Sequence, residues 1–285
     1  MMIFPDKAVK YLVIGHPVGH SRSPRMQNEA FRFHRLGEPY GALDVPPEEL
    51  GTFAEFARGN LLGVNVTVPH KGAIMEFVDE IEPTARAAGS VNTLKIVDGR
   101  ICGFSTDGYG MEKALESAFR RPISGAKLLF VGCGGAARAT AFHLAGRGAD
   151  KIWLFNRTKE RADALADGLR RHLPGRDFES FSLADTDALE RAVGEADILI
   201  QATKLGLADD DPAPFPLELL EKSRHRPAIF DTIYRDTPLL RRAAELGIPA
   251  AGGAEMLIHQ GARSFEIWTG LEAPVGEMRR GFYGG

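Results

Sequence analysis

Residues 127–250 alternate short apolar runs with amphipathic segments, and this alternation restricts the chain to few architectures. Apolar runs at 127–131 and 151–155 predict strands, and the segment 136–147 between them predicts a helix. Strands that alternate with helices form a parallel sheet wrapped by helices on both faces, because a parallel crossover needs a long connection. The sequence therefore predicts an α/β fold with a doubly wound, Rossmann-type parallel sheet in this part of the chain.

The loop after the first of these strands has the pattern G-x-G-x-x-A at residues 132–137. Such a pattern alone is weak, but strand, glycine turn, helix and second strand in this order are typical of dinucleotide binding. The N–H groups at a helix N-terminus attract the pyrophosphate. The sequence therefore predicts a cofactor loop formed by Gly132, Gly134, Gly135 and Ala136.

The end of the second strand is basic, where an NAD-dependent enzyme often has an acidic residue for the ribose hydroxyls. Asn156, Arg157, Thr158 and Arg161 lie there. Two arginines four residues apart can bracket a 2′-phosphate, and Thr158 is expected to cap the following helix. The pattern therefore favours NADP as cofactor. The alternative is that both arginines are simply solvent-exposed residues at the start of a helix and bind no ligand.

A β-rich run ends with two polar residues and a lysine at 65–71. Side chains two apart share a strand face, so Asn65 and Thr67 are expected on one side and Val66 and Val68 in a core. The strand is expected to end at residue 69, and a short helix to follow at 71–78. Lys71 at this junction is the candidate for proton transfer. A buried strand followed by a solvated lysine is the alternative.

Two further strands are predicted at 91–97 and 100–106, joined by an Asp-Gly dipeptide that favours a tight hairpin turn. The second strand is followed by Asp107. A carboxylate beside an ammonium group, partly removed from water, can hold a proton near neutral pH, so Lys71 and Asp107 are predicted to be a catalytic pair. In the structural alternatives, Asp107 is the N-cap of a helix at 108–120 and Asn92 is a turn residue.

The composition permits two ordinary domains, since 44% of the 285 residues are hydrophobic. A net charge of −3 gives no bulk basic field for nucleic acid, and no apolar run is long enough to span a bilayer. Residues 1–7 lack a secretory signal, so we expect a cytoplasmic protein without nucleic-acid or membrane partners. No metal site is expected: the two cysteines are too few, and the residues between His16 and His20 disfavour a helix.

Five stretches of the sequence resemble, in order, motifs of the shikimate dehydrogenases: Ser21-Arg22-Ser23-Pro24, 65–71, Val91-Asn92-Thr93, Thr106-Asp107-Gly108 and Gly132-Cys133-Gly134-Gly135-Ala136. The resemblance spans nearly the whole chain. It implies NADP-dependent, reversible reduction of 3-dehydroshikimate to shikimate in aromatic amino acid (chorismate) biosynthesis. It also implies a substrate domain with a mixed sheet at 1–107, completed by 253–285, and an NADP domain at 108–252.

The resemblance further implies roles for single side chains. Lys71 would be the general acid for ketone reduction, with Asp107 positioning it. The substrate would be bound by Ser21, Ser23, Asn65, Thr67, Asn92, Tyr234 and Gln260, and the cofactor also by Thr203, Ile233, Gly253 and Met256. Structural alternatives are an N-cap at Ser23, a strand terminus at Thr203 and core packing at Met256; no capping role is expected for Ser21.

Departures from the family pattern leave other functions open. Ser105 and Gln201 both replace asparagine, which puts local hydrogen bonds in doubt, and the segment after Tyr234 looks shorter than the family's loop. A quinate/shikimate dehydrogenase of broader substrate or cofactor range would have nearly the same pocket. A non-catalytic sensor of nucleotide and metabolite is a further alternative, which the presence of both Lys71 and Asp107 disfavours. Monomer and homodimer are both left open.

Overall fold

The computed structural model describes residues 8–37, 39–208 and 210–284, so the expectation about residues 1–7 lies outside the described part. The chain divides into two compact units, one formed by residues up to 110 with 257 to the end, the other by 111–256. The expected boundaries after residues 107 and 252 stay a prediction about functional domains. No described helix is long and apolar enough to cross a membrane.

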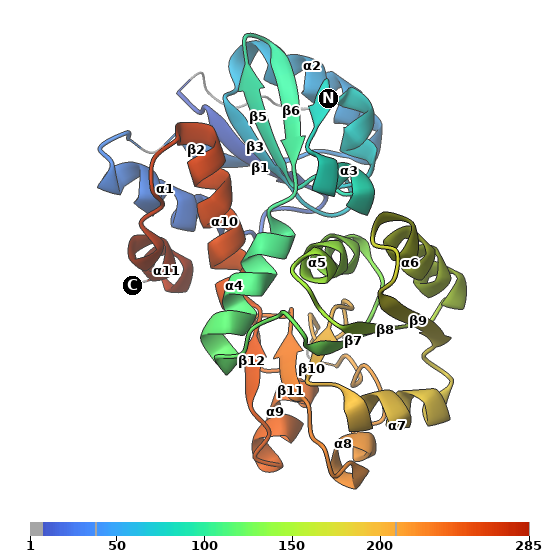
Figure 1. Ribbon diagram of the computed structural model, residues 1–285. Helices are drawn as coiled ribbons and strands as arrows, with labels where there is room; N and C mark the ends of the chain where they lie inside the picture. The colour runs from blue at the N-terminus through green and yellow to red at the C-terminus, as the bar shows by residue number, and fades with distance from the viewer. Residues whose placement is uncertain (1–7, 38, 209, 285) are drawn as a thin grey trace. The chain divides into compact units, whose positions relative to one another are not determined.

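The first unit is built on a mixed six-stranded sheet with the order β2-β1-β3-β5-β6-β4 (Figure 1). Its strands are β1 Tyr11–Gly15, β2 Tyr40–Asp44, β3 Gly63–Val66, β4 Glu80–Ile81, β5 Thr93–Val97 and β6 Arg100–Phe104. β1 pairs in parallel with β2 and β3, whereas β5 runs antiparallel to β3 and β6. The predicted hairpin between β5 and β6 is confirmed, and both turn residues, Asp98 and Gly99, have the positive φ angles that a two-residue turn of type I′ requires.

Helices cover both faces of this mixed sheet, and they come from both ends of the chain. One face packs its apolar side chains on α2 Leu50–Asn60, the 3₁₀ helix η2 Ala73–Phe77 and α3 Pro83–Ala88, with η1 Pro47–Glu49 preceding α2. The other face carries α1 Ser23–Phe33 and α10 Ala254–Thr269, whose aromatic rings meet those of β1. α11 Val275–Tyr283 packs on α1.

One close contact shows how tightly the C-terminal segment joins the first unit. Trp268 of α10 donates its indole N–H to the carbonyl oxygen of Leu94 at 2.8 Å. A Cβ atom at Gly63 would lie 2.5 Å from the Trp268 Nε1 atom, so only glycine fits there without displacing the indole. α10 is therefore part of the core of this unit.

The second unit is built on a parallel six-stranded sheet with the order β12-β11-β10-β7-β8-β9. Its strands are β7 Lys127–Val131, β8 Lys151–Asn156, β9 Asp177–Ser182, β10 Ile198–Gln201, β11 Ala228–Asp231 and β12 Ala250–Gly252. The connections after β7 lead to one side and those after β10 to the other, so the strand order reverses between β7 and β10. Ligands of such sheets bind at this point, outside the carboxyl ends of the strands.

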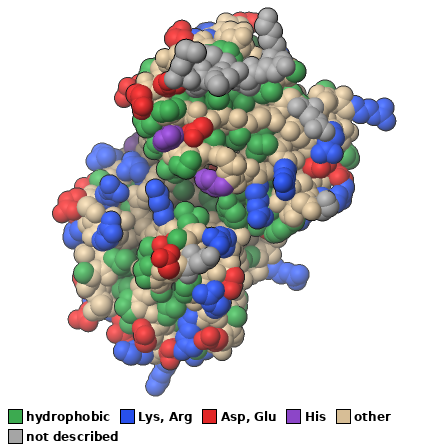
Figure 2. All heavy atoms as spheres, turned by 180° about the vertical axis from the view of Figure 1, so that it is seen from behind, with side chains coloured by type: hydrophobic (Ala, Val, Ile, Leu, Met, Phe, Trp, Pro, Cys, Tyr) green, Lys and Arg blue, Asp and Glu red, His purple; other side chains and the backbone are tan. Residues whose placement is uncertain are grey.

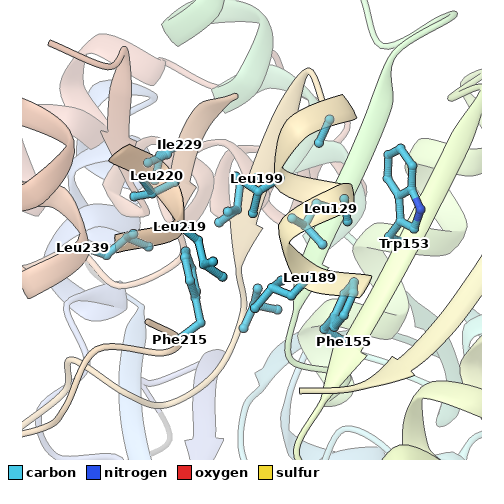
Figure 3. Close-up of a cluster of buried hydrophobic side chains, with 14 of the residues drawn as sticks. Leu129, Trp153, Phe155, Leu189, Leu199, Phe215, Leu219, Leu220, Ile229 and Leu239 are labelled. Carbon is cyan, nitrogen blue, oxygen red and sulfur yellow. The ribbon is translucent and has the colours of Figure 1, made fainter. Parts of the chain in front are cut away.

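Helices wrap this parallel sheet as predicted. A buried cluster joins β7, β8, β10 and β11 to α7 Thr186–Glu195, α8 Glu218–Lys222 and α9 Pro238–Glu245 (Figure 3). α5 Gly135–Gly146 and α6 Lys159–His172 lie on the opposite face of the sheet (Figure 1). α4 Asp107–Phe119 starts in the first unit and continues into the second.

Acidic and basic side chains are interspersed over the face that Figure 2 presents.

Two predictions about the segment 65–78 are wrong. Val68 is 50% exposed and lies outside any core, because β3 already ends at Val66 and its alternation does not continue. The expected helix is a single 3₁₀ segment, Ala73–Phe77, preceded by turns. The chain between β3 and η2 is therefore a loop, and this loop carries Lys71.

Candidate active site

Several polar residues of the first unit gather where four of its strands begin or end, and the topology explains why. We call this line of strand ends the edge of the sheet. β1 and β3 are parallel and end at this edge, where the antiparallel β5 begins and β6 ends. Thr67 follows β3 and donates its N–H to the carbonyl oxygen of Ile14 at 2.8 Å. Asn92 precedes β5 and donates its N–H to the carbonyl oxygen of Phe104 at 3.0 Å. Residues that are far apart in the sequence therefore meet here.

Lys71 and Asp107 form a close ion pair at this edge. The Nζ atom of Lys71 lies 2.5 Å from Oδ2 of Asp107, and the two side chains are 15% and 6% exposed. The carbonyl oxygen of Lys71 accepts the N–H of Val91 at 2.9 Å, which ties the loop to the segment before β5. α4 starts at Asp107 itself, so the carboxylate also lies in the first turn of a helix, where negative charge is favoured. The pair is thus held by backbone on both sides.

Asn92 connects this ion pair to the rest of the site. Its Nδ2 atom donates to Oδ1 of Asp107 at 2.7 Å and to Oγ1 of Thr106 at 3.0 Å. Its Oδ1 atom accepts the N–H of Thr106 at 2.8 Å. Gln260 of α10 lies at the same point, with its Oε1 atom 3.3 Å from Nδ2 of Asn92. Asn92 therefore does more than form a turn, because its side chain fixes the Asp107 carboxylate.

Asn65 is held by groups that the sequence analysis did not identify. Its Oδ1 atom accepts the hydroxyl of Tyr40 at 2.7 Å, and its Nδ2 atom donates to Oγ of Ser264 at 2.9 Å. Burial raises the pKa of Tyr40 well above its usual value, so the phenol stays protonated and donates. Thr93 and Thr106 also belong to this network. Ser264 could have been found, since it lies one helical turn after Gln260 on the same face.

The two serines at the start of α1 differ from the expectation that Ser23 caps the helix and Ser21 has no such role. Oγ of Ser21 accepts the N–H of Ser23 at 3.2 Å, whereas the N-cap position of α1 is Arg22 and no side chain caps the helix there. Ser23 lies inside the helix and is buried, so its predicted capping role is wrong. This turn follows β1 and therefore lies toward the same edge of the sheet. Thr67 lies there too, since a Cβ atom at Gly15 would be 2.5 Å from its Cγ2 atom.

The glycine loop of the second unit fits a dinucleotide. Gly132 has a φ of +105°, and a Cβ atom there would lie 2.9 Å from the backbone of Ala202, so both strain and space require glycine. Gly134 is the N-cap of α5, without a side-chain hydrogen bond, and a Cβ atom there would have no heavy atom within 4 Å. The first N–H groups of α5 therefore open onto free space beside Gly134, as pyrophosphate binding needs. Thr203 lies against this loop, its Cγ2 atom 2.8 Å from the Gly132 Cβ position.

The end of β8 fits a 2′-phosphate. Arg157 and Arg161 are exposed, and no acidic side chain of the described residues forms an ion pair with either guanidinium. Thr158 is the N-cap of α6, as predicted, but its side chain makes no capping hydrogen bond. Two unpaired cations at the start of a helix suit an added anion.

The remaining expected cofactor residues follow the carboxyl ends of β11 and β12. The carbonyl oxygen of Ile233 accepts the N–H of Gly253 at 3.0 Å. A Cβ atom at Gly253 would be 2.1 Å from the carbonyl oxygen of Thr232, so backbone packing already explains this glycine. Met256 is buried and Tyr234 half-buried. Burial raises the pKa of Asp231, whose carboxylate accepts the N–H of Ile233 and thereby fixes the loop.

The two departures from the family pattern have different outcomes. Oε1 of Gln201 accepts the N–H of Thr203, and its Nε2 atom donates to the carbonyl oxygen of Leu205 at 2.8 Å, so the longer amide is fully used. Oγ of Ser105 is buried and has no hydrogen-bond partner among the described residues.

No group of three or more His, Cys, Asp or Glu side chains in the described part could hold a metal ion.

Comparisons with known proteins agree with this geometry. Three family models match: the shikimate dehydrogenase substrate binding domain at 13–94, shikimate / quinate 5-dehydrogenase at 113–207, and the shikimate 5′-dehydrogenase C-terminal domain at 253–280. The NADP(+) shikimate dehydrogenase of Methanopyrus kandleri is 42% identical over 270 residues, covering 94% of this chain and 92% of the relative.

Solved structures extend the comparison to the fold. The shikimate dehydrogenase of Aquifex aeolicus has a TM-score of 0.86 at 34% identity, covering 98% of this chain and 99% of that one. The shikimate 5-dehydrogenase of Thermus thermophilus, solved with NADP(H) and shikimate, has a TM-score of 0.84 at 36% identity, covering 96% and 98%. On fold, site geometry and sequence together, the chain belongs to the shikimate dehydrogenase family.

Proposed function

We propose that this chain catalyses the reversible, NADP-dependent reduction of 3-dehydroshikimate to shikimate, a step of chorismate and aromatic amino acid biosynthesis. The observation that carries the proposal is the Lys71–Asp107 ion pair, 2.5 Å long and largely buried, in a chain whose dinucleotide loop is followed by unpaired arginines. Relatives that match nearly the whole chain are named as NADP(+) shikimate dehydrogenases.

Proton transfer is the task of the chain's own side chains. Bound NADPH supplies the hydride for the ketone carbon. The Nζ atom of Lys71 donates the proton to the ketone oxygen, and in the reverse direction it takes the proton from the hydroxyl. Asp107 holds Lys71 in place through Oδ2, while its Oδ1 atom is held by Asn92. The ammonium and carboxylate together are positioned to contact neighbouring ring hydroxyls.

Polar side chains at the sheet edge would recognise the rest of the substrate. We assign its carboxylate and hydroxyls to Ser21, Ser23, Asn65, Thr67, Asn92 and Gln260 of the first unit, and we add Tyr234 of the second unit. Asn65 accepts from Tyr40 and donates to Ser264, and its Nδ2 atom also lies 3.3 Å from the carbonyl oxygen of Asn92 and from Oγ1 of Thr93, so neighbouring groups already occupy most of its amide. Asn65 therefore contributes mainly by shape and position.

The cofactor would be held entirely by the second unit. We assign the pyrophosphate to Gly132, Gly134, Gly135 and Ala136, the 2′-phosphate side to Asn156, Arg157, Thr158 and Arg161, and the nicotinamide side to Thr203, Ile233, Gly253 and Met256. The first unit is accordingly the substrate-binding domain and the second the NADP-binding domain. We further propose a cytoplasmic enzyme, monomeric or homodimeric, without nucleic-acid or membrane partners.

The test is an assay of NADP+ and NAD+ reduction by the purified protein with shikimate and with quinate, in all four combinations. Activity confined largely to shikimate with NADP+ supports the proposal. Comparable activity with quinate or NAD+ indicates the broader quinate/shikimate class instead. Binding of shikimate and NADP+ without any reduction would overturn the enzymatic proposal in favour of a sensor.

A further inference from the structure

The side chain of Asn156, at the end of β8, bridges two loops that the proposed function assigns to different parts of the cofactor. We infer that Asn156, on the 2′-phosphate side of the proposed site, acts there as a positioning residue and not as a direct phosphate ligand. It holds the glycine loop at 132–135 and the turn at 157–158 in fixed positions. The inference rests on the proposed NADP site and refines its architecture.

Two hydrogen bonds define the bridge. The Oδ1 atom of Asn156 accepts the N–H of Cys133 at 3.2 Å, and its Nδ2 atom donates to the carbonyl oxygen of Thr158 at 2.8 Å. The partners determine the orientation of the amide, because an N–H can only donate and a carbonyl oxygen can only accept. Both sides of the amide are therefore occupied by backbone, one in each loop.

The bridge continues the ladder between β7 and β8 beyond the point where backbone pairing ends. Gly132 donates its N–H to the carbonyl oxygen of Phe155 at 2.7 Å, and the next N–H, that of Cys133, turns to the Asn156 side chain instead. On the other side of β8, the carbonyl oxygen of Asn156 accepts the N–H of Leu183 at 3.0 Å. Asn156 is thus fixed by neighbours on both sides. Its side chain in turn restrains the backbone at Cys133, just before the first N–H groups of α5.

The bridge predicts a pattern of cofactor affinities. The pyrophosphate is common to NAD+ and NADP+, whereas Arg157 and Arg161 would meet only the 2′-phosphate of NADP+. Loss of the bridge loosens the glycine loop, so Asn156→Ala should weaken both cofactors by a similar factor, about three- to tenfold, as expected for one ordinary hydrogen bond. A direct phosphate ligand would instead lose affinity for NADP+ alone.

The first experiment needs no cofactor. Amide hydrogen exchange at Cys133, followed by NMR in the full-length protein, should be slow in the wild type and about tenfold faster in Asn156→Ala. Asn156→Asp keeps an acceptor for the Cys133 N–H but cannot donate to Thr158, so it should retain the protection. It also serves if the alanine variant does not fold. Unchanged Cys133 exchange in the alanine variant, or lost protection in the aspartate variant, would overturn the bridge.

The second experiment is calorimetric titration of the wild type, Asn156→Ala and Arg157→Ala with NADP+ and with NAD+. Equal weakening of both cofactors by Asn156→Ala, beside selective weakening of NADP+ by Arg157→Ala, supports the inference. A selective loss of NADP+ in Asn156→Ala overturns it and makes Asn156 a phosphate ligand. If the wild type binds neither cofactor, the proposed function fails, while the exchange experiment still decides whether the bridge exists.

Discussion

The two candidate half-sites are built on opposite physical principles. In the first unit, Lys71, Asp107, Asn92 and Asn65 are buried or nearly so and hydrogen-bond to one another or to neighbouring protein side chains. In the second unit, the first turn of α5 has no side-chain cap, and the arginines at the start of α6 are exposed. The first half-site is therefore already satisfied internally, whereas the second one presents unpaired donors.

This difference fits the ligands that each unit would hold. A small ring with one carboxylate and several hydroxyls is discriminated by donors and acceptors held at fixed positions, because a misplaced buried partner costs about 1–3 kcal/mol. A phosphate is bound by charge and backbone N–H groups, which tolerate more freedom. Substitutions should consequently act on turnover in the first unit and on cofactor affinity in the second.

The largest effect is expected at Lys71. Lys71→Ala removes the proposed proton donor and should lower kcat by about 10²- to 10⁴-fold, with a much smaller change in KM for shikimate. Steady-state kinetics of the purified variant measure this. Lys10→Ala removes a half-buried lysine of the same unit, whose Nζ atom contacts only the carbonyl oxygen of Asn60 among the hydrogen bonds of the described residues, and should leave kcat unchanged.

Stability must be measured beside these kinetics, because Lys71→Ala also leaves the Asp107 carboxylate without its ion-pair partner. Lys71→Arg keeps a cation beside Asp107 but replaces a compact ammonium by a planar guanidinium. It should therefore melt near the wild-type temperature and still turn over slowly. A Lys71→Ala variant with near-normal kcat would remove Lys71 from the proposed role and end the contrast between the two half-sites.

A smaller effect is expected from the arginine pair. The double variant Arg157→Ala with Arg161→Ala should raise KM for NADP+ about ten- to hundredfold, since it would remove the two proposed charge-assisted contacts to one phosphate group. The KM for NAD+ should change little, and kcat should be retained. Arg170→Ala, at the other end of α6 and paired with Asp167, is the matched control. An equal rise in KM for NADP+ and NAD+ would show that these arginines do not bind the 2′-phosphate.

The sequence predicted the second unit better than the first, and the reason is the range of the interactions. Parallel strands and crossover helices have local periodicities, so β7 was predicted with its observed bounds and the doubly wound sheet is confirmed. The hairpin of β5 and β6 was equally local. The position of Val68 was wrong because alternation was extended past the end of β3.

The candidate site depends on contacts that no local pattern contains. Asn65 bonds to Tyr40, 25 residues away, and to Ser264, 199 residues away. The capping role expected of Ser23 was wrong because the N-cap of α1 is one residue earlier, so Ser23 lies in the helix and its N–H is bound by Ser21. Residue types and motif order therefore indicated which side chains matter, but not how they are connected.

A buried carboxylate outside either half-site has both of its oxygens hydrogen-bonded to basic side chains. In the second unit, the buried carboxylate of Glu112 accepts from His143 Nε2 and Arg147 Nε, each at 2.6 Å. Glu112→Gln should lower the free energy of unfolding by about 1–3 kcal/mol at neutral pH, because bonds to a charged group are lost. Urea denaturation measures this. Glu116→Gln, on the same helix and more exposed, should change it by less than about 0.5 kcal/mol.

The Glu112 contribution should also depend on pH with a definite sign. Burial alone would raise the pKa of this carboxyl, but the hydrogen bonds from His143 and Arg147 outweigh it and lower the pKa below its ordinary value of 4.5. The stabilisation is therefore present above pH 4.5 and is lost as the pH falls through the lower folded-state pKa. The difference between wild type and Glu112→Gln should shrink in that range. A difference that stays constant would mean that the cluster acts by packing rather than by charge.

The smallest effect sharpens the claim that the first half-site is internally satisfied. Ser90 is buried beside the Lys71 loop, and its Oγ atom has no hydrogen-bond partner among the described residues. Ser264 is equally buried, but its Oγ atom bonds to Asn65 and Thr93. The same substitution should therefore have opposite signs: Ser90→Ala should raise the free energy of unfolding by up to about 1 kcal/mol, and Ser264→Ala should lower it by about 1–3 kcal/mol. Urea denaturation of both variants decides this, and a loss of stability in Ser90→Ala would show that its hydroxyl is hydrogen-bonded in solution.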